Sequence, residues 1–556
     1  MKNDLFRRKN IHSFLVIIIV LIGGLCRFYN LNWDDGYNYH PDEMNITAAV
    51  SRIVIPGQMD PGFFAYNGFP IYVYRATAEI LSRITSDTSW VQEWSQITLI
   101  GRFISAFLST LSIYLIYWIG KNVISKNAAL LAAYLTTVTV GLIQTAHYGV
   151  TESMLIFFML ILIVCAIRIG KEKKMFSRHW YAMALVSGLA IGTKTSALSF
   201  LIIPLVTWAI LFYREKSIAL FLRGVSFCVV TFTLCVIVSP YSFLNFSAFS
   251  ASMKYESEVV WGTLQVPYTL QFQHTLPYWF FFKNLHWHAG PIIPTMGCMG
   301  MIWWLLVIIR TRREAINVLP LLLFGILYWG YVGGWYAKFI RYMVPLIPIL
   351  TLSTCWLFDK LLNYLKARPL TVTLLLFSLI TTTAWAGSFM FIYNAPSTRT
   401  AASQWIYTHI PENSVILTEH WDYRVPVHLM NNIRPPFQHA LMRNFDPDTD
   451  KKVMDMSITL ERGDYLILAS RRLSGTIGKA YDKYPFTSRY YEKLFDGILG
   501  YTLIQTFSSY PTFWGLEIND DGAEETFQVF DHPVVHIFKN SEHLPASHLV
   551  KILREH

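Results

Sequence analysis

Two adjacent carboxylates, Asp42 and Glu43, follow the first long apolar run of the chain, within the sequence His40-Pro41-Asp42-Glu43. A proline disfavours helix at the residue before it and suits the first turn of a helix, so this pattern predicts a helix that begins at Pro41. Both carboxylates would lie in its first turn, where the helix dipole favours their ionised forms. Such a pair either caps a surface helix or serves as an acid–base group. The choice depends on what else lies on the same side of the chain.

Further ionisable side chains stand at the ends of long apolar runs. An ionised group inside a bilayer costs about 2.5–3.5 kcal/mol, so each of these positions needs a physical reason. Taken singly, each side chain could simply extend to the membrane surface. Taken together, the cations predict a pocket for a phosphate or diphosphate. These residues are Arg102, His147, Glu152, Lys194, Lys338 and Arg341, and Tyr342 follows the last of them directly.

Carboxylates beside a phosphate-binding cluster at a bilayer surface suit one class of reaction. Lys and Arg would stabilise a lipid-phosphate leaving group. A carboxylate would accept the proton of an acceptor hydroxyl as that hydroxyl attacks a sugar carbon from the opposite side. The residues do not identify the sugar. The same carboxylates could hold a divalent cation through their oxygens, although no ligand spacing requires one, and no cofactor is predicted with certainty.

Two other functions fit the same charges. A transporter or flippase for a lipid-linked sugar would use the cations for phosphate without breaking a bond. It would be expected to show paired, Gly- or Pro-interrupted helices in two repeated halves, and no such repeat is visible. A sensor or scaffold would use the membrane part only as an anchor, for which so many spans with placed charges are excessive.

The composition predicts a polytopic α-helical membrane protein, since 53% of the 556 residues are hydrophobic and only 15% are charged. All six cysteines fall in apolar segments without metal-ligand spacing, which predicts free buried thiols. Apolar runs near the ~20 residues that cross a bilayer recur along the chain and predict about eleven spans. They lie at about 12–29, 97–120, 128–146, 150–169, 180–193, 196–213, 224–243, 291–309, 316–335, 342–359 and 370–393.

The loops on one side of these spans are all basic, as the positive-inside rule requires of the cytoplasmic side. The N-terminus is therefore predicted inside, with an uncleaved first span, and the C-terminus outside the cytoplasmic membrane. This distribution also explains the net charge of +10, which argues against a nucleic-acid partner. The basic loop residues are Lys121, Lys126, Lys171, Lys173, Lys174, Arg178, Arg214, Lys216, Arg223, Arg310, Arg312, Arg313, Lys360, Lys366 and Arg368.

Three outside segments are long. Residues 30–96 carry the acidic motif and two predicted interfacial helices, at about 44–55 and 69–84. Residues 244–290 are rich in aromatic side chains and are interpreted as an interfacial belt. The segment from 394 to 556 has the composition of a soluble domain. Its pattern predicts a helix at 401–409 and strands at 414–418, 465–469 and 534–538. The sequence thus predicts a transmembrane domain (1–393) and an extracytoplasmic α/β domain (394–556).

The membrane half resembles the polyprenyl- or dolichyl-phosphate-sugar-dependent glycosyltransferases of the C-type membrane fold. This family includes the protein O-mannosyltransferases and the bacterial aminoarabinose transferase. The resemblance rests on the acidic pair in the first outside loop and on the acidic turn that ends at Glu152. It also rests on three short motifs: Gly101-Arg-Phe-Ile-Ser105, Gly188-Leu-Ala-Ile-Gly-Thr-Lys-Thr-Ser196 and Lys338-Phe-Ile-Arg-Tyr-Met-Val-Pro345.

The resemblance implies an inverting transfer of a sugar from a polyprenyl-phosphate carrier, at the outer membrane surface, to an acceptor that it does not identify. It implies that Asp42 is the catalytic base and that Glu43 supports the site. Glu152 would orient groups or bind a cation, although many relatives have aspartate there. The resemblance assigns the carrier phosphate to four cations: Arg102, Lys194, Lys338 and Arg341.

Overall fold

The computed structural model describes residues 2–172, 177–215, 217–311, 315–364, 368–429 and 436–555. The chain divides into two compact units. We call Met1–Asn32, His40–Ser257 and Leu276–Gly387 the membrane unit, and Trp33–Tyr39, Glu258–Thr275 and Ser388–His556 the sheet unit. Six of the predicted inside-loop cations lie outside the described residues: Lys173, Lys174, Lys216, Arg312, Arg313 and Lys366.

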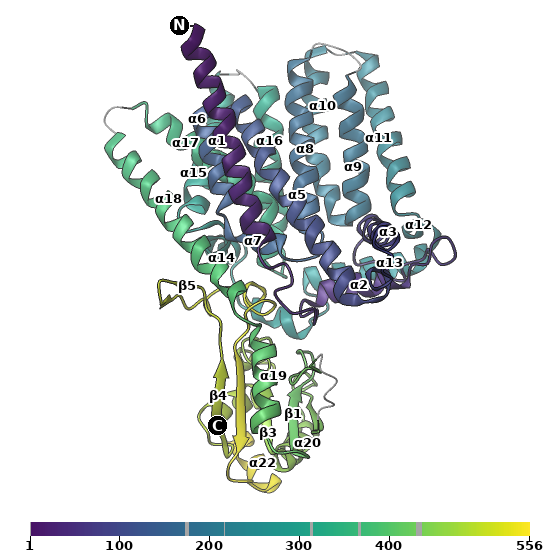
Figure 1. Cartoon of the computed structure of the whole chain (residues 1–556), viewed down its shortest axis with the longest axis vertical. Helices are drawn as coiled ribbons and strands as arrows, with labels where there is room; N and C mark the ends of the chain where they lie inside the picture. The colour runs from purple at the N-terminus through teal and green to yellow at the C-terminus, as the bar shows by residue number, and fades with distance from the viewer. Residues whose placement is uncertain are drawn as a thin grey trace. The chain divides into compact units, whose positions relative to one another are not determined.

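The membrane unit is built from helices (Figure 1). Its helices, with α13 and α18 continuing into the sheet unit, are α1 (Lys2–Phe28), α2 (Pro41–Arg52), α3 (Gly68–Thr85), α4 (Ser89–Gln92), α5 (Trp94–Val123), α6 (Lys126–Thr137), α7 (Val140–Ala146), α8 (Glu152–Lys171), α9 (Arg178–Thr193), η1 (Thr195–Leu201), α10 (Ile202–Glu215), α11 (Ile218–Val238), α12 (Tyr241–Leu244), α13 (Phe246–Trp261), α14 (Trp279–Ala289), α15 (Ile293–Thr311), α16 (Ala315–Val332), η3 (Ile340–Leu346), α17 (Ile347–Leu361) and α18 (Arg368–Met390).

Eight helices in the described part of the chain are long and apolar enough to cross a membrane. The pair α6 and α7, bent by 54°, would make a ninth span. This number is smaller than predicted because the spans expected at 180–193 and 316–335 form the shorter helices α9 and α16. The 16 residues of α9 rise only ~24 Å, whereas the hydrocarbon core is ~30 Å thick. The predicted class, a polytopic α-helical membrane protein, is confirmed.

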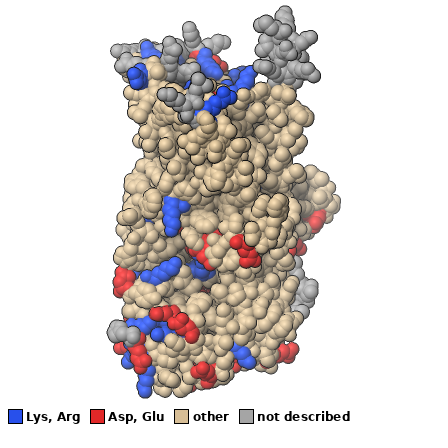
Figure 2. Space-filling view, turned by 90° about the vertical axis from the view of Figure 1, so that its left-hand side faces the viewer, with Lys and Arg blue, Asp and Glu red and all other residues tan. Residues whose placement is uncertain are grey.

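Several helices of the membrane unit expose large apolar side chains on their outer faces. On α11 these include Phe221, Val229 and Ile237, and on α1 they include Phe14 and Leu25. On the face shown in Figure 2, a broad region carries few charged side chains, and Lys and Arg gather at its upper edge. An apolar face of this kind is stable against lipid and would be unfavourable in water.

The segment 30–96, predicted outside, contains the two predicted short helices, observed as α2 and α3. Helix α2 packs against α3 and against the membrane-spanning α5. It buries Ile46, Ala49 and Val50 on one side and turns its acidic first turn toward other parts of the membrane unit. The sequence of α2 therefore holds the carboxylates at one end of the spanning helices.

The sheet unit contains a five-stranded sheet of order β2-β1-β3-β7-β4 and a two-stranded hairpin, β5-β6. Strand β1 is parallel to β2 and β3, and β7 is antiparallel to β3 and β4. The elements are η2 (Pro267–Phe272), η4 (Phe391–Asn394), α19 (Thr398–His409), β1 (Val415–Glu419), β2 (Gln438–Met442), α20 (Asp450–Arg462), β3 (Tyr465–Leu468), η5 (Ile477–Lys479), α21 (Pro485–Phe495), β4 (Tyr501–Phe507), β5 (Thr512–Phe513), β6 (Leu516–Glu517), η6 (Glu525–Phe527), β7 (Val535–Asn540) and α22 (Ala546–Arg554).

Alternate residues of the central strands enter two different cores. Leu466 and Leu468 of β3 pack in one core, while Ile467 packs in the other. Because both faces of the sheet are covered, β3 is a continuous apolar run and β1 begins with three apolar residues. Strand β7 is apolar at Val535, Ile537 and Phe538, and the sequence predicts all three strands. The sequence analysis did not predict β2 and β4, which contain exposed or partly polar positions.

Candidate active site

The acidic motif begins α2 with a cap that the sequence analysis did not assign. The Nδ1 atom of His40 accepts a hydrogen bond of 3.1 Å from the backbone N–H of Asp42, so His40 is the N-cap of the helix. Pro41 occupies the first helical position, as predicted. The ring of His40 also packs against that of Tyr148, with centroids 4.5 Å apart. His40 therefore fixes the backbone of the first turn of α2, from which the side chain of Asp42 extends.

Asp42 forms an ion pair with Arg341, a residue almost 300 positions later in the chain. Both side chains are 23% exposed, so the pair can be reached from outside. Burial by itself would raise the pKa of Asp42, but Arg341, His40 and Lys194, together with a hydrogen bond from Tyr66, lower it well below its usual value. Asp42 is consequently an ionised carboxylate at neutral pH.

Lys194 and Glu152 also belong to the charged group around Asp42. Lys194 ends α9, and its Nζ lies 3.5 Å from Oε1 of Glu152, the first residue of α8. The same Nζ lies 4.7 Å from the centroid of the Tyr66 ring. Within the described residues, Oε2 of Glu152 and Nε of Arg341 are buried without a hydrogen-bond partner. Buried polar atoms of this kind are usually satisfied, so a substrate group is a natural partner for them.

Two further residues belong to this group and were missed in the sequence analysis. Burial and the nearby carboxylates Asp42 and Glu152 keep the pKa of Tyr66 well above its usual value, so its hydroxyl stays protonated and can donate to Asp42. Glu256 of α13 has a pKa raised by burial and by Asp42, against the opposing effect of Lys194 and Arg341. Glu256 lies in the outside segment that was interpreted as an aromatic belt. The sequence could have indicated Glu256 as a site residue only because its carboxylate was predicted on the same side of the membrane as Asp42.

Glu43 and Arg102 form a separate, fully buried pair. Arg102 donates from Nε to Oε1 of Glu43 at 2.8 Å and from Nη2 to Oε2 at 2.7 Å, and each side chain is 1% exposed. The N–H of Gly149 also donates to Oε1, at 2.5 Å, and Arg102 donates to the carbonyl of Leu31 at 2.9 Å. The structure therefore does not bring Glu43 or Arg102 into the charged group around Asp42. The pair joins α2, α5 and the turn before α8.

Three predicted site residues remain, His147, Lys338 and Tyr342, and of these Tyr342 lies close enough to Arg341, Glu256 and Asp42 to interact with their charges. The two ring nitrogens of His147 each lie 2.9 Å from a backbone carbonyl, of Ile143 and of Tyr29, so His147 joins α7 to the end of α1. Lys338 is buried and donates to the carbonyl of Tyr336 at 3.0 Å, and burial lowers its pKa to about 8. The ring of Tyr342 lies 5.9 Å from the guanidinium of Arg341.

The possible divalent cation finds no ligand cluster in the described part of the chain. Among those residues, no group of three or more His, Cys, Asp or Glu side chains is arranged to hold a metal ion. The six cysteines are free thiols, as predicted, but only Cys165, Cys235 and Cys355 are also buried; Cys26 and Cys298 are half-buried and Cys228 is exposed. What the site contains is an ionised carboxylate, two carboxylates beside it and two cations, gathered from α2, α8, α9, α13 and η3.

Comparison with known proteins identifies one family. Residues 90–254 match the family described as dolichyl-phosphate-mannose-protein mannosyltransferase. No curated protein matches the chain.

Several solved structures have a similar fold. The oligosaccharyltransferase of Archaeoglobus fulgidus in the apo form matches with a TM-score of 0.54 and 14% identity, over 91% of this chain and 75% of that one. Its complex with an inhibitory peptide and a dolichol-phosphate, under the name AglB, matches with a TM-score of 0.50 and 14% identity, over 92% and 75%. ArnT from Cupriavidus metallidurans in the apo state matches with a TM-score of 0.48 and 13% identity, over 82% and 92%. The family match and the two oligosaccharyltransferase structures confirm the predicted fold and the predicted resemblance.

Proposed function

We propose that the chain is a glycosyltransferase of the C-type membrane fold, which the family match over residues 90–254 and the similarity of fold support, and that it transfers a sugar from a polyprenyl-phosphate carrier to an acceptor with inversion at the anomeric carbon. The observation that carries the proposal is the ion pair of Asp42 and Arg341, with Lys194, Glu152 and Glu256 around it. One surface-accessible site thus combines an ionised carboxylate with cations that suit a phosphate.

The cations are assigned to the donor phosphate. Arg341 presents a planar guanidinium, which binds phosphate oxygens in a bidentate manner, and Lys194 adds a point charge. Negative charge accumulates on the phosphate as the bond to the sugar breaks, so fixed cations stabilise the transition state more than the ground state. In the absence of donor, Asp42 and Glu152 balance these cations.

Asp42 is assigned as the base. Its low pKa makes it a weak base, but it is always ionised, and it can accept a hydrogen bond from the acceptor's hydroxyl as that group attacks. The pKa of Glu256 is shifted in the opposite direction, upward, by burial and by the charge of Asp42. Carboxyl groups whose environments separate their pKa values in this way commonly divide the roles of base and donor. Glu256 would then donate a hydrogen bond to the departing phosphate or to the sugar.

Glu43 and Arg102 are assigned a positioning role. Their buried pair fixes the first turn of α2 against α5, and Asp42 is the neighbour of Glu43 in that turn. Lys338 and His147 would support the site from its surroundings, and Tyr342 would lie within it, beside Arg341. The acceptor hydroxyl belongs to a protein, a glycan or a lipid, and the site is proposed to face the outer side of the cytoplasmic membrane, with the N-terminus inside.

The test is transfer by the purified protein in lipid nanodiscs, with a panel of radiolabelled polyprenyl-phosphate sugars. Asp42→Asn is expected to lower the rate by roughly two to four orders of magnitude. Asp87→Asn is the matched control, because Asp87 is an exposed residue of the same outside segment. Full activity of Asp42→Asn would refute the assignment of the base. Movement of donor across the bilayer without release of polyprenyl phosphate would instead identify a flippase.

A further inference from the structure

The hairpin of β5 and β6 exposes a set of apolar side chains at its tip. Trp514 is 93% exposed and Leu516 is 73% exposed, and Phe513 stacks on Trp514 with ring centroids 5.0 Å apart. The residues from 508 to 519 include no Lys or Arg. The turn is regular, with Trp514 and Gly515 both at positive φ, so the exposed tip is a defined structure.

The hairpin is held next to the point where the chain leaves its last predicted span. Strand β5 contacts η4 within the sheet unit. Segment η4 follows α18 directly, since Phe391 succeeds Met390, and α18 is long and apolar enough to cross the membrane. Because α18 ends at Met390, we expect residues that pack beside η4 to lie near the depth of the lipid headgroups.

Tryptophan is the side chain best suited to that depth. Its indole ring is apolar but carries an N–H group, and Trp and Tyr are enriched where spanning segments meet water. In water the same tip would expose a large apolar surface without compensation. Aqueous contact therefore does not explain Phe513, Trp514 and Leu516, whereas a lipid surface does.

We propose that the tip of the β5-β6 hairpin inserts into the outer headgroup region of the bilayer and anchors the sheet unit to it. The occupant of this surface is phospholipid. This proposal does not depend on the chemistry at Asp42.

The test uses the full-length protein with exposed Cys228 replaced by Ser, and with a fluorophore attached through Trp514→Cys. Lys551→Cys on α22, also exposed, is the matched control. Both are reconstituted in phosphatidylcholine vesicles, with or without phosphatidylcholine that carries a spin label on its acyl chain near the headgroup. The label at 514 is expected to lose most of its fluorescence to the quencher, and the label at 551 to lose little.

Equal quenching at the two positions would overturn the proposal. A change in the fluorescence of the label at 514 with protein concentration, in vesicles without quencher, would also overturn the proposal, because a second copy of the chain would then be the occupant. Since Trp514 is almost fully exposed, its replacement leaves the packing of the sheet unit intact, and both labelled proteins can be compared in the folded state.

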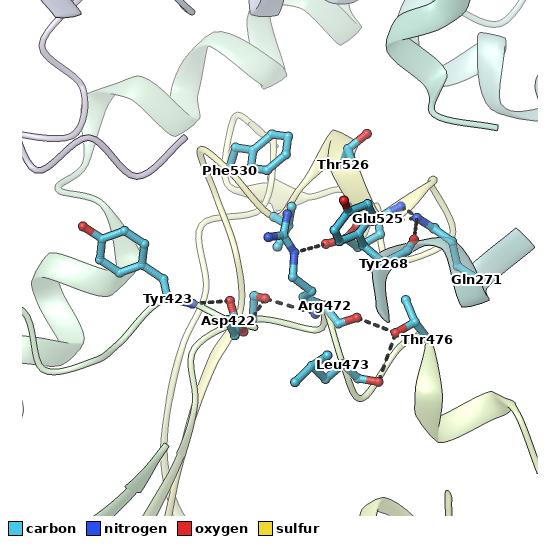
Figure 3. A network of polar contacts seen from close by, with 12 residues as sticks. Tyr268, Gln271, Asp422, Tyr423, Arg472, Leu473, Thr476, Glu525, Thr526 and Phe530 are labelled. Carbon is cyan, nitrogen blue, oxygen red and sulfur yellow. Dashed lines mark hydrogen bonds and ion pairs between the residues drawn. The ribbon is translucent and has the colours of Figure 1, made fainter. Parts of the chain in front are cut away.

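A second, independent observation concerns the segment 258–275, which belongs to the sheet unit although it lies between two helices of the membrane unit. Leu270 is part of the core of the sheet unit. Gln271 donates to Glu524 at 2.7 Å and accepts from the backbone N–H of Glu525 at 3.1 Å. Figure 3 shows Arg472 pointing at Glu525, to which it donates at 3.0 Å, beside the rings of Tyr268 and Phe530.

This segment continues the helix that carries Glu256. Helix α13 runs to Trp261, five residues beyond Glu256, and the chain then turns into η2, which carries Gln271. The hydrogen bonds of the backbone of Leu264 and the hydroxyl of Thr263 to the carbonyl of Glu258 keep this turn compact. Gln271 is therefore linked to Glu256 through the 14 residues 257–270 of one continuous segment.

We infer that Gln271, held by Glu524 and by Glu525, which Arg472 holds in turn, is a positioning residue that sets Glu256 in the active site. This inference rests on the proposed function. It gives the sheet unit a task in the transfer reaction, since the unit supplies the restraint on the loop.

The test is a double-mutant cycle on transfer rate. Gln271→Ala is expected to reproduce the loss of kcat of Glu256→Gln, and the double variant is expected to be no worse than Glu256→Gln alone. Gln404→Ala, on the exposed face of α19, is the control. Wild-type activity of Gln271→Ala, or losses that multiply in the double variant, would overturn the inference. Full activity of Asp42→Asn would refute the proposed function instead, so the two failures can be distinguished.

Discussion

The buried pair of Glu43 and Arg102 separates two explanations of the acidic motif. If Arg102 held the donor phosphate, as the family resemblance implies, its loss would weaken donor binding. In the structure it is bound by both carboxylate oxygens of Glu43. Replacing Arg102 by Met should therefore destabilise the fold while leaving the KM for donor in the folded enzyme unchanged.

The size of this effect follows from the burial of the pair. Both side chains are 1% exposed, and removing one partner of a buried ion pair costs about 3–5 kcal/mol. The double variant Glu43→Gln with Arg102→Met removes the charge but keeps an acceptor for the N–H of Gly149. A neutral, incompletely bonded amide costs about 1–3 kcal/mol, so the double variant should recover about 2 kcal/mol of the loss.

The assay is the free energy of unfolding of the wild type and the three variants in detergent micelles, from denaturant titration, together with the KM for donor of each folded protein. A double-mutant cycle then gives the coupling of the two side chains. If Arg102→Met keeps the stability of the wild type and raises the KM for donor, Arg102 binds phosphate and the positioning role is refuted.

Three further predictions concern pH. Because the folded pKa of Asp42 is lowered, its carboxylate stays ionised where an ordinary aspartate is protonated, so the acid limb of the pH–rate profile should lie below the ordinary aspartate pKa of ~3.9. The stability that this carboxylate contributes is present above that value and is lost only as pH falls through the folded pKa. Arg341→Gln should move the acid limb of the pH–rate profile to higher pH, because Asp42 loses the cation that lowers its pKa. An unmoved limb would contradict this. The folded pKa of Lys338 is lowered to about 8. Between that value and ~10.4 the unfolded chain binds more protons than the folded one, so the free energy of unfolding should rise with pH in this range. Thermal unfolding should show this rise in the wild type and not in Lys338→Met. His532 lies between Asp520 and Asp531, at 2.7 and 2.5 Å; burial opposes its charge, but the two carboxylates raise its pKa to about 10. The stability that charged His532 contributes should be complete below pH ~6.5 and disappear as pH rises through about 10. Resistance to proteolysis, measured against pH, should show this loss in the wild type and not in His532→Gln.

Local patterns were sufficient for much of the architecture. Long apolar runs predict the spanning helices, Pro41 predicts the start of α2, and continuous apolar runs predict β1 and β3, because each of these signals depends on near neighbours in the chain. The count of spans was less secure, since α9 is apolar enough to suggest a span but is only 16 residues long.

The active site required tertiary structure. The sequence could place Asp42, Lys194 and Arg341 on one side, because topology follows from loop charge, but it treated all outside cations as equivalent. Packing then decided that Arg341 pairs with Asp42 while Arg102 pairs with Glu43. It also brought Tyr66 and Glu256 to the site from segments with no motif of their own. Side of the membrane is a property that each loop carries separately, whereas the partner of a charge depends on how helices distant in sequence pack together.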